Sequence, residues 1–205
     1  MKQGEFFQPV SQARERVFDL EGADVRLWDG FLSPAESESL FEDLRQNTDW
    51  EQEHLVMYGK AVLAPRLTAW HGDRRCVYRY SGVEHVPLQW TSTLDSIRQR
   101  VVERVGEKFN SVLLNYYRDG RDSVSWHSDD EPHLGPVIAS LSLGAARTFQ
   151  LKHKDRTDLP RVDIELSPGS LLVMGGGCQT NWRHQLPKRR RATGSRINLT
   201  FRVFD

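Results

Sequence analysis

Apolar positions follow a helical period in two stretches of the chain. In the first, Ser33 can cap a helix, Pro34 suits its first turn, and Glu36 completes a capping box with the serine. An apolar stripe follows at Leu40, Phe41 and Leu44. We therefore expect a helix that starts after Ser33 and ends near Asn47.

The second stretch has apolar residues at spacings of three and four. They are Trp90, Leu94, Ile97, Val101 and Val105. Charged residues fill the opposite face, and Gly106 can end the helix in a left-handed conformation. This pattern predicts a second amphipathic helix with Trp90 in the core.

Short strand patterns, separated by glycine and proline, dominate the chain after Lys108. The candidates are residues 112–117, 137–143, 148–152, 162–166, 171–174 and 197–204. Earlier, residues 55–62 read as a hairpin around Gly59, and residues 76–81 as a strand. Residues 1–26 have no strong periodicity and suit a loose arm or an edge strand. Helices followed by strands predict an α+β fold, in which helices pack on one side of a double-stranded β-helix, or jelly roll.

Composition limits the class of protein. The 205 residues suit one domain, and equal numbers of basic and acidic residues, 28 of each, argue against a generally basic nucleic-acid coat. Two cysteines without a C-x-x-C motif indicate a reducing compartment. No apolar stretch has the length of a signal peptide or a membrane span, so we expect no membrane partner and a cytoplasmic location, or a nuclear one in a eukaryotic cell. We also expect a monomer.

One end of the chain departs from this balance of charge. Between Gly175 and Phe204 there is no acidic residue. The basic residues there are Arg183, Lys188, Arg189, Arg190, Arg191, Arg196 and Arg202. Three interpretations of the run from Lys188 to Arg191 stay open: a solvated loop, a phosphate contact, or a nuclear targeting signal.

The motif His-x-Asp at His127 and Asp129 indicates a metal site. Residues two apart on a strand point to the same face, so one imidazole and one carboxylate could bind one ion. His184 would complete a triad that leaves adjacent positions open on iron(II). The tripeptide alone is a weak signal, because it occurs often by chance.

The last candidate strand alternates strictly between polar and apolar residues. Its polar residues are Arg196, Asn198, Thr200 and Arg202. Either this is an edge strand with its polar face in water, or the polar face lies inside a barrel, where the arginines bind a small dicarboxylate. Asn115 and Tyr117, also two residues apart, are either a strand end and a core residue or hydrogen-bonding groups for the same ligand.

Together, these blocks resemble the AlkB family, iron(II)- and 2-oxoglutarate-dependent dioxygenases that repair alkylated nucleic-acid bases. The matching blocks are residues 115–120 (Asn-Tyr-Tyr-Arg-Asp-Gly), residues 127–131 (His-Ser-Asp-Asp-Glu), His184, and residues 196–202. Pro65-Arg66 and residues 78–82 (Tyr-Arg-Tyr-Ser-Gly) resemble the subgroup that acts on duplex DNA.

The resemblance implies a role for each matching residue. The catalytic iron ligands are His127, Asp129 and His184. The 2-oxoglutarate ligands are Asn115, Tyr117, Arg196, Asn198, Thr200 and Arg202. The substrate-binding residues are Met57, Tyr58, Gly59, Arg66, Tyr78, Tyr80, Ser81, Asp130 and Glu131. It also implies an N-terminal extension over residues 1–26, nucleotide-recognition hairpins over 50–85 and a catalytic jelly roll over 108–205.

The implied activity is oxidative demethylation of bases such as 1-methyladenine and 3-methylcytosine in DNA, duplex or single-stranded. The reaction uses iron(II), 2-oxoglutarate and oxygen, and it releases succinate, carbon dioxide and formaldehyde. Two alternatives stay open: the same chemistry on RNA or on a protein side chain, and a nucleic-acid-binding domain with an inactive metal site.

Overall fold

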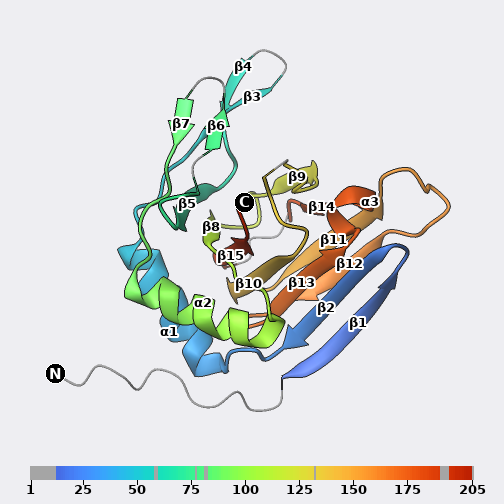
Figure 1. Cartoon of the computed structure of the whole chain (residues 1–205), viewed down its shortest axis with the longest axis horizontal. Helices are drawn as coiled ribbons and strands as arrows, with labels where there is room; N and C mark the ends of the chain where they lie inside the picture. The colour runs from blue at the N-terminus through green and yellow to red at the C-terminus, as the bar shows by residue number, and fades with distance from the viewer. Residues whose placement is uncertain are drawn as a thin grey trace.

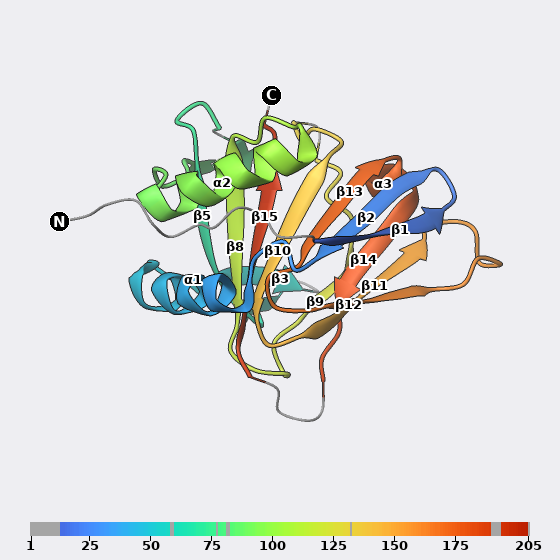
Figure 2. The same ribbon diagram turned by 90° about the horizontal axis from the view of Figure 1, so that it is seen from below.

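The computed structural model describes residues 13–57, 60–76, 78–80, 83–131, 133–189 and 194–204. Two antiparallel sheets lie face to face, and two helices cover the outer face of the larger sheet (Figures 1 and 2). This arrangement confirms the predicted jelly roll with helices on one side. Among the described residues, no helix is both long and apolar enough to cross a membrane.

The larger sheet has seven strands in the order β1-β2-β13-β10-β15-β8-β5. Their bounds are β1 Arg14–Leu20, β2 Ala23–Asp29, β13 Leu171–Gly176, β10 Ile138–Gly144, β15 Arg196–Arg202, β8 Ser111–Tyr117 and β5 Leu67–Gly72. The smaller sheet has the order β12-β11-β14-β9. Its strands are β12 Val162–Leu166, β11 Arg147–His153, β14 Trp182–Leu186 and β9 Val124–His127.

Two hairpins project from the body on the same side of the molecule (Figure 1). One pairs β3, His54–Met57, with β4, Lys60–Leu63, and the other pairs β6, Tyr78–Tyr80, with β7, Val83–His85. The first confirms the hairpin predicted from residues 55–62.

Both predicted helices are present, and their ends follow the capping residues. Helix α1, Pro34–Asn47, has the capping box: the Ser33 side chain accepts from the Glu36 backbone N–H, and Glu36 accepts from the Ser33 N–H at 2.8 Å. Helix α2, Ser92–Val105, ends at Gly106, whose φ of 81° is left-handed. A third, short helix, α3, spans Cys178–Asn181.

Trp90 does not belong to α2, contrary to the prediction. The helix begins after Thr91, whose side chain caps it, so Trp90 lies outside the helical repeat. Its ring is half-buried at the edge of the core, its Nε1–H donates to Asp73 at 2.9 Å, and the Arg98 guanidinium lies over it. The polar indole N–H and the overlying cation keep this ring at the surface of the core.

Residues 14–26 were assigned to an extension, and that boundary is wrong. They form β1 and most of β2 at the edge of the larger sheet, which agrees with the edge-strand alternative. Val25 and Leu27 on β2 are fully buried, whereas Arg26 between them is exposed. Together with β5, these strands lie before residue 108, so the sheet core extends beyond the predicted 108–205. Residues 1–12 lie outside the described ranges.

Two apolar cores hold the layers together. The first lies between the helices and the larger sheet, and it includes Leu94 and Ile97 of α2 with Leu199 and Phe201 of β15. The second lies between the two sheets, where Ile138 of β10 shares a cluster with residues of β11 and β12. The polar interior of the jelly roll lies beside this second core.

Candidate metal centre and cofactor pocket

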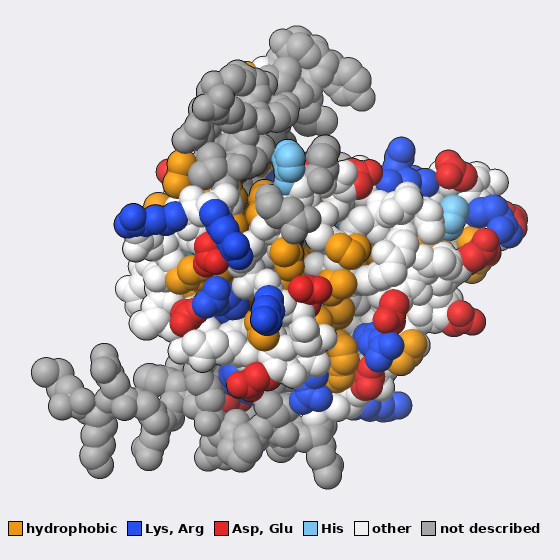
Figure 3. Space-filling view, viewed as in Figure 1, with side chains coloured by type: hydrophobic (Ala, Val, Ile, Leu, Met, Phe, Trp, Pro, Cys, Tyr) orange, Lys and Arg blue, Asp and Glu red, His pale blue; other side chains and the backbone are white. Residues whose placement is uncertain are grey.

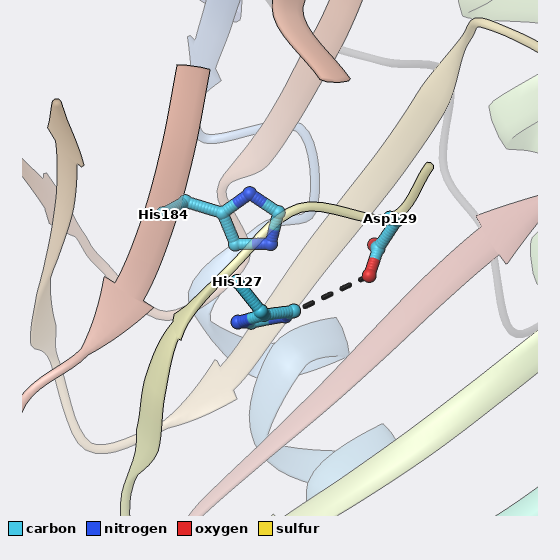
Figure 4. A group of neighbouring side chains, drawn as sticks. All are labelled: His127, Asp129 and His184. Carbon is cyan, nitrogen blue, oxygen red and sulfur yellow. Dashed lines mark ion pairs between the residues drawn. The ribbon is translucent and has the colours of Figure 1, made fainter. Parts of the chain in front are cut away.

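The predicted metal ligands come together at one end of the smaller sheet. The ligand atoms of His127, Asp129 and His184 all lie within 4.8 Å of one another (Figure 4). His127 ends β9 and pairs directly across the ladder with His184 of β14, so the two ring centroids are 4.2 Å apart. The Nε2 atom of His127 lies 3.6 Å from Oδ1 of Asp129. This spacing is compact enough for one ion to take all three ligands.

The sequence argument for His127 and Asp129 was wrong about how the fold joins them. Strand β9 ends at His127, and Asp129 lies in the segment that follows. The turn of the chain after the strand, and not the pleat, directs the carboxylate toward the imidazole.

Hydrogen bonding and burial prepare both histidines for a metal. Nδ1 of His127 lies 2.8 Å from the carbonyl oxygen of Ser125, and donation through Nδ1–H leaves the Nε2 lone pair free for a metal. His184 is buried, and burial, the main cause, lowers its pKa to about 3, so the ring is neutral at physiological pH. Its Nδ1 atom is buried without a hydrogen-bond partner among the described residues.

Asp129 is held as a carboxylate by its neighbours. Burial opposes its ionisation, but Arg202 and the two histidines outweigh that cost, and its pKa is lowered to about 2. Nη2 of Arg202 donates to Oδ2 of Asp129 at 2.8 Å, and the Asp129 backbone N–H donates to Oε1 of Gln179 at 3.0 Å. The carboxylate is therefore ionised and fixed in orientation.

The polar face of β15 lies inside the barrel. The strand is central, between β10 and β8, so the edge-strand interpretation is wrong. Ile197, Leu199 and Phe201 are fully buried against the helices, and the polar residues between them are also buried. A polar row shielded from water on a central strand requires partners within the barrel.

Arg196 is a buried cation without a carboxylate partner among the described residues. Its side chain donates to Oγ of Ser142 at 2.9 Å, and its guanidinium carbon lies 5.3 Å from the centroid of the Tyr117 ring. The residue is only 2% exposed, its Nε–H is buried without an acceptor in the described structure, and burial lowers its pKa to about 10. A desolvated guanidinium in this state favours a bound anion.

Two further residues of the predicted pocket are engaged by the protein itself. Oδ1 of Asn115 accepts a hydrogen bond from Nε of Arg66 at 2.8 Å. The amide nitrogen of Asn198 donates to Oγ of Ser140 at 2.7 Å and to a backbone carbonyl, and its oxygen accepts from Thr200. Since its amide hydrogens already have acceptors, Asn198 stabilises the wall of the pocket. Direct contact between Asn198 and 2-oxoglutarate stays a prediction.

The predicted substrate residues are only partly within the described structure. Tyr58, Gly59 and Ser81 lie outside the described residues, and the side chains of Met57, Tyr78 and Tyr80 are not described. Asp130 and Glu131 are exposed, directly after the metal ligand. Their contacts with a base stay predictions.

Sequence reasoning missed three polar residues that support the site. Gln179 of α3 accepts from the Asp129 backbone, Ser142 of β10 accepts from Arg196, and Lys154 contacts Asp130. These residue types are common at chain positions without any motif. They can be recognised as part of the site only from their long-range contacts, which depend on the fold.

The basic run is anchored where it is described. The Arg189 backbone N–H donates to the carbonyl of Gly120 at 2.6 Å, and Arg147 donates to the carbonyl of Pro187 at 2.7 Å. The side chains of Lys188 and Arg189 are exposed, and Arg190 and Arg191 lie outside the described residues.

Comparison with known proteins agrees with this geometry. A model of the 2OG-Fe(II) oxygenase superfamily matches residues 24–202. Alpha-ketoglutarate-dependent dioxygenase alkB homolog 3 from Rattus norvegicus is 42% identical, over 92% of this chain and 70% of the relative. The same enzyme from Homo sapiens is 40% identical, over 96% of this chain and 76% of the relative. DNA oxidative demethylase ALKBH2 from Mus musculus is 41% identical, over 82% of this chain and 75% of the relative.

Solved structures support the fold independently. The structure of OsALKBH1 superposes with a TM-score of 0.64 at 15% identity, over 92% of this chain and all of that one. A prolyl hydroxylase from Trichoplax adhaerens superposes with a TM-score of 0.59 at 13% identity, over 88% of this chain and 83% of that one. With the family match over most of its length and relatives at about 40% identity, the chain belongs to the 2OG-Fe(II) oxygenase superfamily and, within it, to the AlkB family.

Proposed function

We propose that this protein removes N-linked methyl groups from bases such as 1-methyladenine and 3-methylcytosine in DNA. The observation that carries the proposal is a compact His-Asp-His cluster in the same barrel as Arg196, a buried arginine that has no carboxylate partner among the described residues. The relatives named as alkB homologs and as DNA oxidative demethylases support this choice of reaction and of substrate.

The residues present fit the iron(II) and 2-oxoglutarate that the family uses. His184 has a buried ring nitrogen without a partner, and Arg196 has a buried N–H without an acceptor in the described structure. The first suits a metal ligand and the second suits a carboxylate of 2-oxoglutarate. With iron(II) and 2-oxoglutarate bound, the site could use oxygen as the oxidant: one oxygen atom enters succinate as 2-oxoglutarate loses carbon dioxide, and the other hydroxylates the N-methyl group, which then leaves as formaldehyde.

The protein's own groups orient the reactants. Arg196 can bind a carboxylate through two parallel hydrogen bonds and fix its direction inside the barrel. Arg202 holds the Asp129 carboxylate in place, so the third ligand is preorganised. Asp130 and Glu131 are exposed and directly follow the candidate ligand Asp129, and we expect their carboxylates to favour a base that methylation has made cationic.

Duplex DNA is the finer part of the proposal. In the described part of the surface, Figure 3 shows acidic and basic side chains mixed over the visible face, so affinity for phosphates has to come from local groups. Exposed Lys188 and Arg189 are such groups. The hairpins β3–β4 and β6–β7 project from one side of the barrel, where we expect them to help extract a base from the stack.

The test compares one 1-methyladenine oligonucleotide as single strand, as duplex and as RNA, with and without iron(II). We expect iron-dependent release of formaldehyde and succinate in equal amounts, with the duplex DNA repaired at least as fast as RNA. Preference for RNA would change the substrate class and keep the chemistry. Absence of formaldehyde on all three substrates, in a preparation that binds iron, would contradict the proposed demethylation.

A further inference from the structure

The four residues after His127 carry much of the site's chemistry but lie outside any regular strand. Within them, Asp129 is the candidate metal ligand, and Asp130 and Glu131 are the exposed acidic residues that follow it. No sheet ladder holds this segment. Its last residue is fixed by a backbone bond, from the Leu134 N–H to the Glu131 carbonyl at 3.0 Å, and residues 129 and 130 are fixed by side-chain hydrogen bonds.

Two residues from elsewhere in the fold hold consecutive positions of this segment. Buried Gln179 accepts from the Asp129 backbone N–H at 3.0 Å. Lys154 donates from Nζ to Oδ2 of Asp130 at 3.0 Å, and the Ser128 hydroxyl donates to the same oxygen at 3.1 Å.

Lys154 and Gln179 also contact each other. Nζ of Lys154 donates to the backbone carbonyl of Gln179 at 2.9 Å, and the Lys154 backbone N–H donates to the carbonyl of Asn181 at 2.7 Å. The Lys154 side chain is 18% exposed, so its ammonium group is held by protein and only slightly by water. Lys154 thus links α3 to Asp130, and Lys154 and Gln179 together hold residues 129 and 130.

The carboxylates of the acidic pair have different surroundings. Asp130 is compensated by Lys154, whereas Glu131 has no ion pair or side-chain hydrogen bond among the described residues. Within the described part of the chain, Glu131 is therefore the carboxylate of the acidic pair that no cation compensates. Its direction depends on the preceding residues, which Lys154 and Gln179 hold.

We propose that Lys154 is a positioning residue that fixes residues 129–131 and thereby sets the preference for cationic methylated bases over unmethylated ones. The inference rests on the proposed demethylation. Loss of the lysine has two opposing effects: the segment loosens, and its surroundings become more negative. The Asp130 side chain is 58% exposed, so water screens its charge, and we expect the loss of orientation to dominate.

The test uses Lys154→Met, which keeps the length of the side chain and removes the donor, and Lys154→Arg, which keeps a donor and a charge. The matched control is Lys152→Met, two positions earlier on β11, where the ammonium lies 4.4 Å from the Trp126 ring centroid. It loses the same charge two residues earlier in the chain, and its ring contact is with Trp126 and not with residues 128–131.

For Lys154→Met we expect KM for the methylated duplex to rise about tenfold, which is the size of one charged hydrogen bond, while KM for 2-oxoglutarate stays within about twofold. Without iron, fluorescence anisotropy should give a smaller ratio of Kd values between unmethylated and methylated duplexes. Lys154→Arg should recover most of both effects, and Lys152→Met should show neither. Melting temperatures of all variants separate this selective loss from partial unfolding.

The possible failures are distinguishable. A wild type that repairs no methylated base would overturn the proposed function and this inference with it. An active wild type together with an unchanged or lower KM for the duplex in Lys154→Met would overturn the inference alone. Equal changes of the duplex KM in Lys154→Met and Lys152→Met would show that only the loss of a positive charge matters, which would also overturn the inference.

Discussion

The arginines at the two ends of β15 share a strand face but have different partners. Arg202 forms an ion pair with Asp129 at 2.8 Å, whereas Arg196 has a hydroxyl and an aromatic ring beside it and no carboxylate among the described residues. A buried cation is stabilised only when an anion or good acceptors replace water. Arg202 therefore holds the carboxylate of the candidate metal ligand, whereas Arg196 keeps a buried N–H without an acceptor in the described structure; binding of 2-oxoglutarate by either arginine stays a prediction.

Replacing Arg196 by lysine should weaken 2-oxoglutarate binding although the charge is kept. Lysine cannot form the two parallel hydrogen bonds, and a hydrogen bond to a charged group contributes about 1.5–3 kcal/mol, so we expect KM for 2-oxoglutarate to rise about tenfold or more. Initial rates of succinate formation measure it. Arg161→Lys, in an exposed ion pair with Asp163, is the control and should leave KM unchanged. An unchanged KM in Arg196→Lys would remove this residue from the pocket.

Replacing Asp129 by alanine should abolish metal binding and turnover. The two histidines alone do not complete a facial triad, so calorimetric titration with manganese(II) should show no binding at the site. Arg202 loses its carboxylate, and we expect the free energy of unfolding to fall by about 1–3 kcal/mol with the fold retained. The neighbouring Asp130→Ala should keep its manganese(II) binding. Metal binding by Asp129→Ala close to that of wild type would show that this carboxylate is not a ligand.

At the scale of elements, one ion pair joins the two helices. Glu36 of α1 accepts from Arg100 of α2 at 3.1 Å, and both side chains are mostly buried, at 13% and 11% exposure. Glu36 also completes the capping box with Ser33. One carboxylate thus stabilises the start of α1 and its packing against α2, and both helices cover the face of the sheet opposite to the pocket.

Glu36→Gln should destabilise the protein by about 1–3 kcal/mol, because it removes the charged acceptor and weakens the cap. Burial opposes ionisation of Glu36, but the Ser33 hydrogen bonds and the Arg100 charge outweigh it and hold its pKa below 4.5. Because the pKa of Glu36 is lower in the folded protein than in the unfolded chain, its ionised carboxylate stabilises the fold at pH values above the unfolded-state pKa. This stabilisation is lost as the pH falls through the folded-state pKa. The difference between wild type and variant should therefore be full at pH 7 and shrink below about pH 4.5.

Urea unfolding at several pH values measures this difference. Glu42→Gln is the control on the same helix, since Glu42 pairs with Arg45 at the surface, where water screens the pair, and it should leave the stability almost unchanged. A constant difference between wild type and Glu36→Gln down to pH 3 would show that the lost stability does not come from the ionised carboxylate.

Elements that carry local signals were predictable, and those defined by distant partners were not. The capping box at Ser33 and the alternation in β15 are local, and both gave correct elements. By contrast, β9 and β14 are short, and their pairing through His127 and His184 depends on the closure of the smaller sheet. The place of Asp129 beyond the end of β9, and its contact with Gln179, likewise follow from the fold and not from spacing.

At the scale of the whole molecule, one buried arginine connects the basic run to the barrel. Arg147 donates to the backbone carbonyls of Asp119, Asp122 and Pro187, at 3.3, 3.0 and 2.7 Å. Its guanidinium carbon also lies 5.8 Å from the centroid of the Tyr117 ring, on the strand next to Arg196. The residues before the basic run are therefore fixed to the wall of the pocket, so phosphate contacts there would set the position of the substrate relative to the site.

The double variant Lys188→Ala with Arg189→Ala tests these phosphate contacts. Each lost contact should reduce the slope of log affinity against log salt by about 0.9, so the slope for duplex binding should fall by about 1–2. Repair of a free methylated nucleoside should be unchanged, because it has no neighbouring phosphates. Arg104→Ala with Lys108→Ala, two exposed basic residues in and just after the last turn of α2, removes the same charge as a control. Equal salt slopes for wild type and both double variants would show that the basic run is a solvated loop without phosphate contacts. An equal fall of the slope in both double variants would show that only the net charge of the protein matters.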